Sequence, residues 1–282
     1  MVDNPPNAPP EGPRWLSLGA VHLPYLEVGD PAGRPVVLVP GLTDGIAPVT
    51  EPLTRAMLAD VPLPILRYRG LALSHRFPAE AVLTTRDLAA DLAGALEVLI
   101  DQPAVLVCHS MGGMVAQHLA ADRPDLVAAM ILSATVPRAD TILRRVLADW
   151  SRVVRVGDAA AYAKLAIAAS YTGVERDRRA ALVVADPPSP LPPEAIARHL
   201  ALSHACATHD ALDRLGAVRA PTLVLAGEHD PVAPPHQGAR LAAGIADATF
   251  EVFRGLSHGF PEQDPEGFTR RATRFLELHG GR

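Results

Sequence analysis

The sequence contains few cysteines, few aromatic residues and no long hydrophobic run. Its two cysteines, Cys108 and Cys206, form no metal-binding spacing, so we expect both to be reduced in a cytoplasmic protein. No apolar run approaches the roughly 18 residues that a transmembrane helix needs. Residues 1–14 lack the basic and apolar regions of a signal peptide. These absences together predict a soluble protein without a membrane partner.

Charge is not concentrated in one sign. The formal net charge of the 282 residues is −5 and no long basic run occurs, which argues against a nucleic acid or an anionic membrane surface as partner. Lys164 is the only lysine, so it is the one candidate for Schiff-base chemistry. Phosphate-binding glycine loops and clusters of metal ligands are absent from the sequence, so no cofactor and no metal are predicted. The expected partner is a small-molecule substrate, and a homodimer is left open.

Hydrophobic residues make up 49% of the chain, which is enough to bury a large sheet. Short apolar runs alternate with helical patterns, and this alternation predicts a mostly parallel central sheet flanked by helices, an α/β fold. Residues 1–14 are proline-rich and are expected to form a disordered or polyproline-like tail. Two antiparallel edge strands are predicted within 15–28, and further strands at 36–39, 64–68, 105–108, 128–132, 222–226 and 249–253.

Helices are predicted between these strands. The pattern favours a helix over 51–59 and another that opens with a capping box at residues 84–87. A further helix is expected directly after Ser110. Arg69-Gly70 is expected to end the strand at 64–68.

Between residues 138 and 212 the chain changes character. Apolar residues recur there at helical spacing, interrupted by a proline-rich break at 186–193. We therefore predict that 138–212 forms an inserted helical cap. The α/β core is expected to comprise 15–137 and 213–282.

The stretch from Val105 to Gly113 carries the strongest chemical signal. Apolar residues without polar alternation suit a strand buried on both faces, and they lead directly into Ser110 and a helix. In a nucleophile elbow the serine is held in a strained turn at the top of the sheet, and Gly112 supplies the space that such a turn needs. The usual G-x-S-x-G pattern has glycine where this chain has Cys108. An ordinary βα loop therefore remains the alternative at this point.

Two later loops follow strands at their carboxyl ends, where open α/β sheets bind their ligands. The loop at 227–232 contains Asp230, and the loop at 255–260 contains His258. Both side chains are therefore expected to meet Ser110. Other candidates for the acid or the base lie close by in sequence: Glu228, His229, His236 and, beside the serine, His109, which is expected to support packing or line the pocket.

The order Ser110, Asp230, His258 resembles that of the α/β-hydrolase catalytic triad. Residues from about 15 to 278 are similar to the capped serine hydrolases of that superfamily. The resemblance rests on His109 to Gly113, Gly227 to Pro231 and Ser257 to Gly259, with Pro40-Gly41 and Arg69-Gly70 as weaker support.

This resemblance implies a role for each residue. Ser110 would be the nucleophile, His258 the general base and Asp230 the residue that orients the histidine. The backbone N–H groups of Leu42 and Met111 would form the oxyanion hole. Pro40 stands where many members have histidine, which changes what lines the oxyanion loop but keeps its backbone donor.

The nucleophile also narrows the chemistry that the resemblance implies. A serine disfavours the haloalkane dehalogenase and epoxide hydrolase mechanisms, which use an aspartate at this position. Hydrolysis of esters, thioesters, lactones or amides remains open. So do C–C bond hydrolysis, acyl transfer, perhydrolysis and a non-catalytic fold that binds a ligand.

The predicted cap favours one substrate class among these. Its residues 138–210 include ten basic and eight acidic side chains, so a substrate of low charge is favoured. We predict a serine hydrolase of a small, low-charge ester, thioester or lactone that forms an acyl-enzyme. Aromatic residues at helical spacing are more often core than substrate contacts, and Thr43 more often ends a turn. With that alternative open, the candidate pocket residues are Thr43, His109, Trp150, Tyr162 and Tyr171.

Ser110→Ala and His258→Ala are each expected to abolish turnover while leaving the fold intact, because the first removes the nucleophile and the second its base. Asp230→Asn is expected to weaken turnover by favouring the wrong histidine tautomer. Steady-state hydrolysis by the purified variants, with circular dichroism as the control for folding, checks this. Full activity in either alanine variant would refute the assignment.

Overall fold

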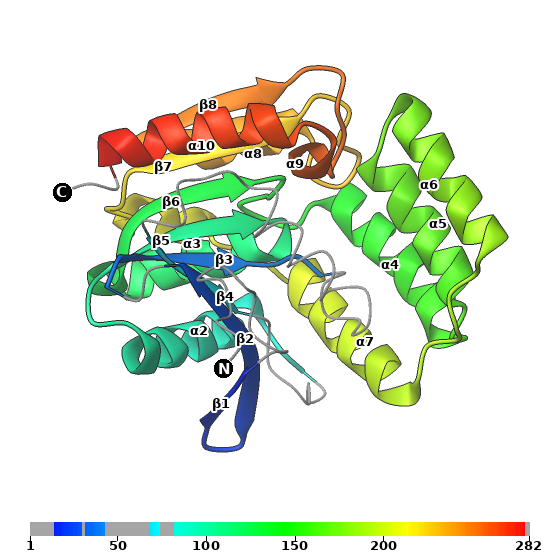
Figure 1. Cartoon of the computed structure of the whole chain (residues 1–282), viewed down its shortest axis with the longest axis horizontal. Helices are drawn as coiled ribbons and strands as arrows, with labels where there is room; N and C mark the ends of the chain where they lie inside the picture. Colours follow the sequence, from blue (N-terminus) through cyan, green and yellow to red (C-terminus); the bar gives the residue numbers. More distant parts are fainter. Residues whose placement is uncertain (1–13, 30–31, 43–67, 74–81, 280–282) are drawn as a thin grey trace, which may run out of the picture.

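A computed structural model describes residues 14–29, 32–42, 68–73 and 82–279 of the chain. Figure 1 shows a central sheet with helices on both sides and a separate group of helices, α4 to α7, beyond one end of the strands. Several predicted features lie outside the described residues. They are positions 1–13 of the tail predicted at 1–14, the helix at 51–59, positions 64–67 of the strand predicted at 64–68, and Thr43. The prediction that Arg14 belongs to the tail is wrong, because Arg14 is the first residue of the first strand and pairs with Tyr25.

The sheet has eight strands within the described residues, in the order β1-β2-β4-β3-β5-β6-β7-β8. β2 runs antiparallel to both β1 and β4, whereas all pairings from β4 through β8 are parallel. The predicted mostly parallel α/β sheet with antiparallel edge strands is therefore confirmed. The strands span Arg14–Leu18 (β1), Val21–Gly29 (β2), Arg34–Val39 (β3), Tyr68–Leu73 (β4), Ala104–His109 (β5), Val127–Ser133 (β6), Thr222–Gly227 (β7) and Ala248–Phe253 (β8).

The expectation that Arg69-Gly70 ends a strand is wrong. These two residues lie inside β4, which continues to Leu73. Gly70 pairs with Val28 of β2 on one side and with Val36 of β3 on the other. Pairing with two neighbouring strands outweighs the usual tendency of glycine to interrupt a strand.

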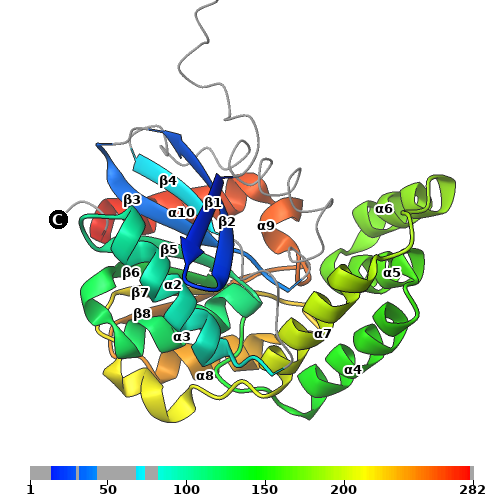
Figure 2. The same cartoon turned by 90° about the horizontal axis from the view of Figure 1, so that it is seen from below.

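Alternate residues of the buried strands face two different helical layers. In β5, Leu106 and Cys108 belong to the core cluster that contains residues of α2 and α3, whereas Val105 and Val107 pack with residues of α10. Both faces are apolar, which explains why β5 shows no polar alternation. Figure 2 shows α2, α3 and α8 on one side of the sheet and α10 on the other. The flanking helices span Thr85–Leu99 (α2), Met111–Asp122 (α3), Pro235–Ala243 (α8), Phe260–Gln263 (α9) and Pro265–His279 (α10).

Local hydrogen bonds fix where several helices begin. The predicted capping box of α2 is present, because Asp87 N–H donates to Thr84 Oγ1 at 3.2 Å while Thr84 N–H donates to Asp87 Oδ2 at 2.8 Å. Asp140 caps α4 by accepting from Leu143 N–H at 2.8 Å. Such caps satisfy N–H groups that have no partner within the helix, so the sequence alone can indicate these helix starts.

Four α-helices lie between β6 and β7, in the stretch predicted to form a cap. The proline-rich residues at 186–192 separate the last two, as expected. The two ends of the stretch meet in an ion pair between Arg138 and Asp210, with 2.6 Å between Nη2 and Oδ2. Figure 1 shows this group beyond the carboxyl ends of β3, β5 and β6, the edge at which the strand-to-helix loops gather. The helices span Thr141–Arg155 (α4), Ala159–Ser170 (α5), Gly173–Ala185 (α6) and Pro193–Ala207 (α7).

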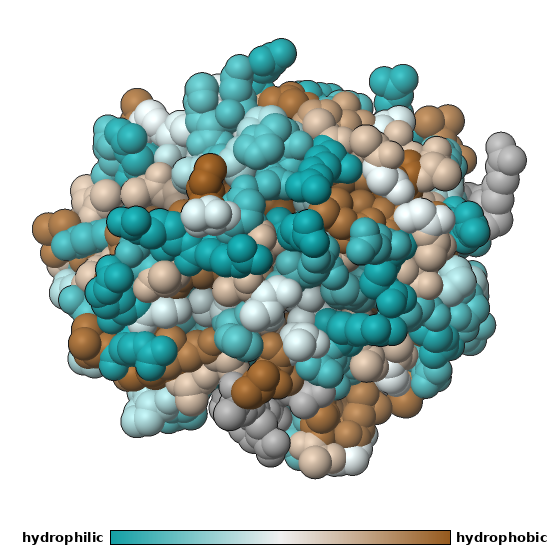
Figure 3. Space-filling model, turned by 180° about the vertical axis from the view of Figure 1, so that it is seen from behind, coloured by the Kyte–Doolittle hydropathy of each residue, from teal (hydrophilic) through white to brown (hydrophobic). Residues whose placement is uncertain are grey.

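In the ranges that the structure describes, no helix is both long and apolar enough to cross a bilayer. The face turned away from the viewer of Figure 1 mixes hydrophilic side chains with smaller hydrophobic areas (Figure 3).

Leu106→Ala is expected to lower the free energy of unfolding by about 2 to 5 kcal/mol, because Leu106 is fully buried in the centre of the sheet and its loss leaves a cavity. The matched control is Val98→Ala on α2, whose side chain is 62% exposed and whose removal should change stability by less than about 0.5 kcal/mol. Urea unfolding of both variants measures the difference. Equal losses would contradict the core that we describe.

Candidate active site

Ser110 occupies the turn between β5 and α3, and its backbone is in the left-handed region with φ of 52°. A residue other than glycine is strained in this conformation. The Ser110 N–H donates to the Ser133 carbonyl of β6 at 2.9 Å, which ties the turn to the neighbouring strand. A Cβ on Gly112 would lie 2.1 Å from the Val39 carbonyl oxygen. The turn therefore needs glycine at position 112, as the nucleophile-elbow interpretation predicts.

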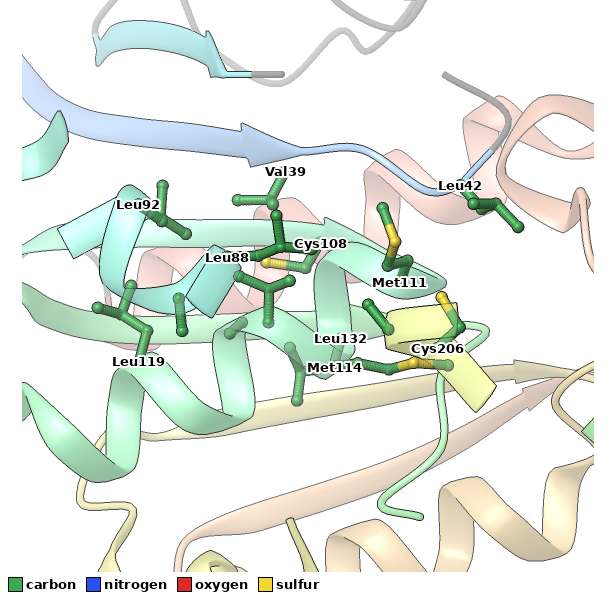
Figure 4. Close-up of a cluster of buried hydrophobic side chains, with 14 of the residues drawn as sticks. Val39, Leu42, Leu88, Leu92, Cys108, Met111, Met114, Leu119, Leu132 and Cys206 are labelled. Carbon is green, nitrogen blue, oxygen red and sulfur yellow. The ribbon is translucent and has the colours of Figure 1, made fainter. Parts of the chain in front are cut away.

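Cys108, at the position where the usual pattern has glycine, does not disturb this turn. Its side chain is 1% exposed and lies in the core beside Val39, Leu88 and Leu92 (Figure 4). Burial raises the pKa of its thiol, so Cys108 behaves as a small neutral side chain. The layer between the sheet and α2 thus accommodates a side chain at this position.

Three side chains form one hydrogen-bonded row. Ser110 Oγ lies 3.0 Å from His258 Nε2, and His258 Nδ1 lies 2.8 Å from Asp230 Oδ2. The residues follow β5, β8 and β7 respectively, so the parallel sheet brings them to one edge. The order of atoms and the distances are those by which a histidine can activate a serine hydroxyl.

The carboxylate of Asp230 is held from two directions. Its Oδ2 faces His258, while its Oδ1 accepts hydrogen bonds from the N–H groups of Val232 at 2.8 Å and Ala233 at 2.9 Å. The Asp230 side chain is fully buried. Its orientation, and with it that of the imidazole ring, is therefore set by the backbone of the loop after β7.

The other acid and base candidates point elsewhere. Glu228 accepts from Gly255 N–H and from the Arg254 guanidinium, each at 2.8 Å, and these two contacts, the backbone one first, lower its carboxyl pKa. His229 and His236 are both exposed. Of the side chains weighed from the sequence, only Asp230 and His258 line up with Ser110.

His109 is a neutral neighbour of this row. Ser133 Oγ donates to the Cys108 carbonyl at 2.9 Å and lies 3.2 Å from His109 Nδ1. Because the hydroxyl hydrogen is already used, this contact requires His109 to donate from Nδ1. The His109 ring is 5.1 Å from the His258 ring, and burial, followed by the proximity of His258, lowers the pKa of His109 to about 3. The geometry agrees with the interpretation that His109 supports packing or lines the pocket.

The two residues predicted to form the oxyanion hole, Leu42 and Met111, lie in segments next to Ser110. Met111 is the first residue of α3, so its N–H has no acceptor within the helix. A Cβ on Gly41 would lie 3.3 Å from Ser110 Cβ, which places the segment of Leu42 next to the nucleophile. Figure 4 shows Leu42 on the chain that leaves β3 and Met111 at the start of α3. Their role in stabilising an oxyanion stays a prediction.

The three aromatic pocket candidates do not form one cluster. Trp150 and Tyr162 pack edge to face inside the inserted helices, with ring centroids 5.9 Å apart, and each is 7% exposed. Tyr171, at the end of α5, instead donates its hydroxyl to Glu262 of α9. The first two are thus part of the packing between helices and the third joins two parts of the fold, so substrate contact by any of them stays a prediction.

Two serines near the row were missed by sequence reasoning. Ser133 orients His109, as described above. Ser257 is 2% exposed and donates its hydroxyl to the Ala169 carbonyl of α5 at 2.6 Å. Ser257 stands directly before His258 in the sequence, but its partner is 88 residues away, so no local signal indicates this contact.

Among residues 14–29, 32–42, 68–73 and 82–279, no group of three or more His, Cys, Asp or Glu side chains is placed to hold an ion. Cys108 and Cys206 are both free thiols and both buried.

The chain is similar to one protein family and to individual proteins of known name. A family model described as serine aminopeptidase, S33, matches residues 34–265, a range that includes the whole row. The chain is also 26% identical over 262 residues to a protein of Azorhizobium caulinodans named "Putative carbamate hydrolase RutD". That match covers 87% of this chain and 95% of RutD.

Solved structures share the fold over nearly the whole chain. An enol-lactonase from Burkholderia xenovorans is 21% identical with a TM-score of 0.80, covering 94% of this chain and 100% of the lactonase. At that identity the likeness shows the fold alone. A thermophilic esterase from Thermogutta terrifontis is 26% identical with a TM-score of 0.74, covering 95% of this chain and 99% of the esterase.

The pKa of His109 predicts how acid affects stability. The unfolded chain binds a proton at His109 near its ordinary pKa of 6.5, whereas the folded protein does so only near 3. Below about pH 6.5 the unfolded state therefore holds more protons, and this group removes about 1 to 2 kcal/mol of stability on going from pH 7 to pH 5. Urea unfolding at both pH values should show that His109→Asn loses that much less than the wild type. Equal losses would mean that His109 is charged in the folded protein.

Proposed function

The chain belongs to the serine aminopeptidase S33 family of α/β-hydrolases, and from this premise we propose that it hydrolyses a small, low-charge ester, thioester or lactone through an acyl-enzyme on Ser110. Its family and its hydrolase-named relatives make it an enzyme of the hydrolase type. The observation that supports an acyl-enzyme on Ser110 is the 3.0 Å contact between Ser110 Oγ and His258 Nε2. A small-molecule partner and a cytoplasmic location belong to the same proposal.

In the acylation step, Ser110 Oγ attacks the carbonyl carbon of the substrate while His258 Nε2 takes the hydroxyl proton. Asp230 accepts the hydrogen bond from Nδ1–H and stabilises the imidazolium that results. The tetrahedral intermediate then breaks the bond to the leaving oxygen or sulfur, which receives the proton from His258. The acyl group remains as an ester of Ser110.

Deacylation repeats these roles with water as the nucleophile. His258 takes a proton from the water that attacks the Ser110 ester, and returns it to Ser110 Oγ as the acid product leaves. The N–H groups of Leu42 and Met111 stabilise the oxyanion in both steps, and loss of one such donor typically costs about 10²- to 10³-fold in rate. A neutral His109 adds no positive charge beside the imidazolium.

Ester-like substrates fit the surroundings of the row better than peptides with a free amino terminus. An aminopeptidase must hold an ammonium group, for which an uncommitted carboxylate is the natural partner. Within the described part of the chain, the carboxylates near the row are already engaged. Asp230 is bound to His258, Glu228 to Arg254, and Glu262 to Tyr171.

The names of the similar proteins support the same class. RutD is named for a carbamate, and the Thermogutta terrifontis structure is that of an esterase. In a carbamate and in an ester, the reacting atom is an acyl carbon that carries a heteroatom leaving group. The proposed attack by Ser110 suits both.

The test is the intact mass after treatment with a fluorophosphonate, which labels serines that are activated by a base. We expect one adduct on the wild type and none on Ser110→Ala. Ser151→Ala serves as the control, because the Ser151 hydroxyl is hydrogen-bonded to Ser203 between two inserted helices, and this variant should label fully at Ser110.

Turnover then distinguishes the substrate class. The wild type is expected to hydrolyse p-nitrophenyl acetate with a kcat/KM well above that for leucine p-nitroanilide, an aminopeptidase substrate. Absence of labelling in well-folded wild type would refute an activated serine, and faster turnover of the anilide would refute the preference for esters.

A further inference from the structure

The end of helix α5 lies against the loop that carries His258. The last carbonyl groups of a helix have no partners within it and must find donors elsewhere. Here the Ala169 carbonyl accepts from His258 N–H at 3.4 Å, and the Ser170 carbonyl accepts from Gly259 N–H at 2.7 Å. An inserted helix thus ends on the backbone of the histidine loop.

The hydroxyl of Ser257 reinforces this contact. Its oxygen lies 2.6 Å from the Ala169 carbonyl and 3.1 Å from the His229 carbonyl, next to Asp230. The Ser257 hydroxyl therefore connects the loop that carries His258 to the end of α5 and to the loop that carries Asp230. Ser257 is 2% exposed, so water does not readily replace it.

The backbone on either side of the loop that carries Ser257 is also closely packed. A Cβ on Gly259 would lie 2.9 Å from the Ser170 carbonyl oxygen, and one on Gly227 would lie 2.3 Å from the Ser257 carbonyl oxygen. The loop that carries His258 is therefore packed closely between the end of α5 and the end of β7. A displacement of α5 would therefore also displace the backbone of His258.

A second set of contacts joins the junction of α5 and α6 to the core. Tyr171 donates to Glu262, and the Arg179 guanidinium stacks on the Tyr171 ring at 4.1 Å while pairing with Glu262 at 3.4 Å. Thr172 Oγ1 donates to the Gly255 carbonyl at 3.0 Å. The junction of α5 and α6 is therefore joined to the core on both sides of the histidine loop.

We propose that Ser257 is a positioning residue for His258, and that the carbonyl end of α5 is a fixed part of the catalytic site rather than of a mobile lid. This inference rests on the proposed function. His258 must keep Nε2 near Ser110 and Nδ1 near Asp230 at once, and a misplacement of about 1 Å in such an arrangement can cost about 10²-fold in rate. Ser257 holds the backbone from which that ring projects.

The experiment compares Ser257→Ala with a control that loses a similar hydrogen bond away from the site. Thr222→Val is suitable, because Thr222 is 1% exposed and its hydroxyl donates to the Ala220 carbonyl at 2.9 Å at the opposite end of β7. For each variant, kcat and KM for p-nitrophenyl acetate, the rate constant of fluorophosphonate labelling and the Tm are measured.

We expect Ser257→Ala to fold, to keep KM within about twofold and to lower both kcat and the labelling rate by about 10- to 100-fold. Thr222→Val should lose a comparable amount in Tm and keep kcat. The proposal is overturned if Ser257→Ala retains kcat and labelling, or loses no more of them than Thr222→Val does. Labelling and turnover by the wild type test the proposed function separately.

Tyr171→Phe gives an independent measurement should Ser257→Ala fail to fold. It removes the hydroxyl that joins α5 to Glu262 and leaves the ring on Arg179 in place. If the contacts at the end of α5 position His258, kcat should fall by severalfold while KM stays unchanged. A changed KM with an unchanged kcat would instead make Tyr171 a substrate contact and would contradict the proposal.

Discussion

The left-handed backbone of Ser110 is a strained conformation that the chain can keep only because two neighbouring strands hold it. Such strain costs about 1 to 3 kcal/mol. β6 binds the Ser110 N–H through Ser133, and β3 comes so close that position 112 has room only for glycine. The apolar layers on both faces of β5 keep these strands in place. The direction of α3, and with it the position of the Met111 N–H, follows from the same turn.

Within the described ranges, several ionisable side chains near this turn are either neutral or paired. Cys108 and His109 are kept neutral by burial, and Glu228 and Glu262 are each paired with an arginine. In the proposed mechanism, a positive charge that forms on His258 is stabilised by Asp230, 2.8 Å from its Nδ1. The neutral or paired state of these neighbours makes that one interaction stronger than it would be in water, since fewer other charges and less solvent compete with it.

The parts of the fold and site that follow from local patterns could be predicted from the sequence. An unbroken apolar run before Ser110 indicates a doubly buried strand, and the order of Ser110, Asp230 and His258 indicates which loops meet. The extent of β4 could not be predicted, because pairing with β2 and β3 decides it. The contact between Ser257 and Ala169 joins residues 88 positions apart, and nothing in either segment marks it. Trp150 and Tyr162 share one helical pattern with many core residues, so the pattern cannot separate packing from binding.

The contact between α5 and the histidine loop limits how freely the insertion could be exchanged between related enzymes. A donor insertion of similar length could reproduce the pairing of Arg138 with Asp210 where the segment leaves and rejoins the core. It would also have to end a helix with carbonyl groups at the positions of Ala169 and Ser170, and leave space against Gly259. A grafted insertion would therefore have to match the core beside His258 as well as at the two points where the segment leaves and rejoins it.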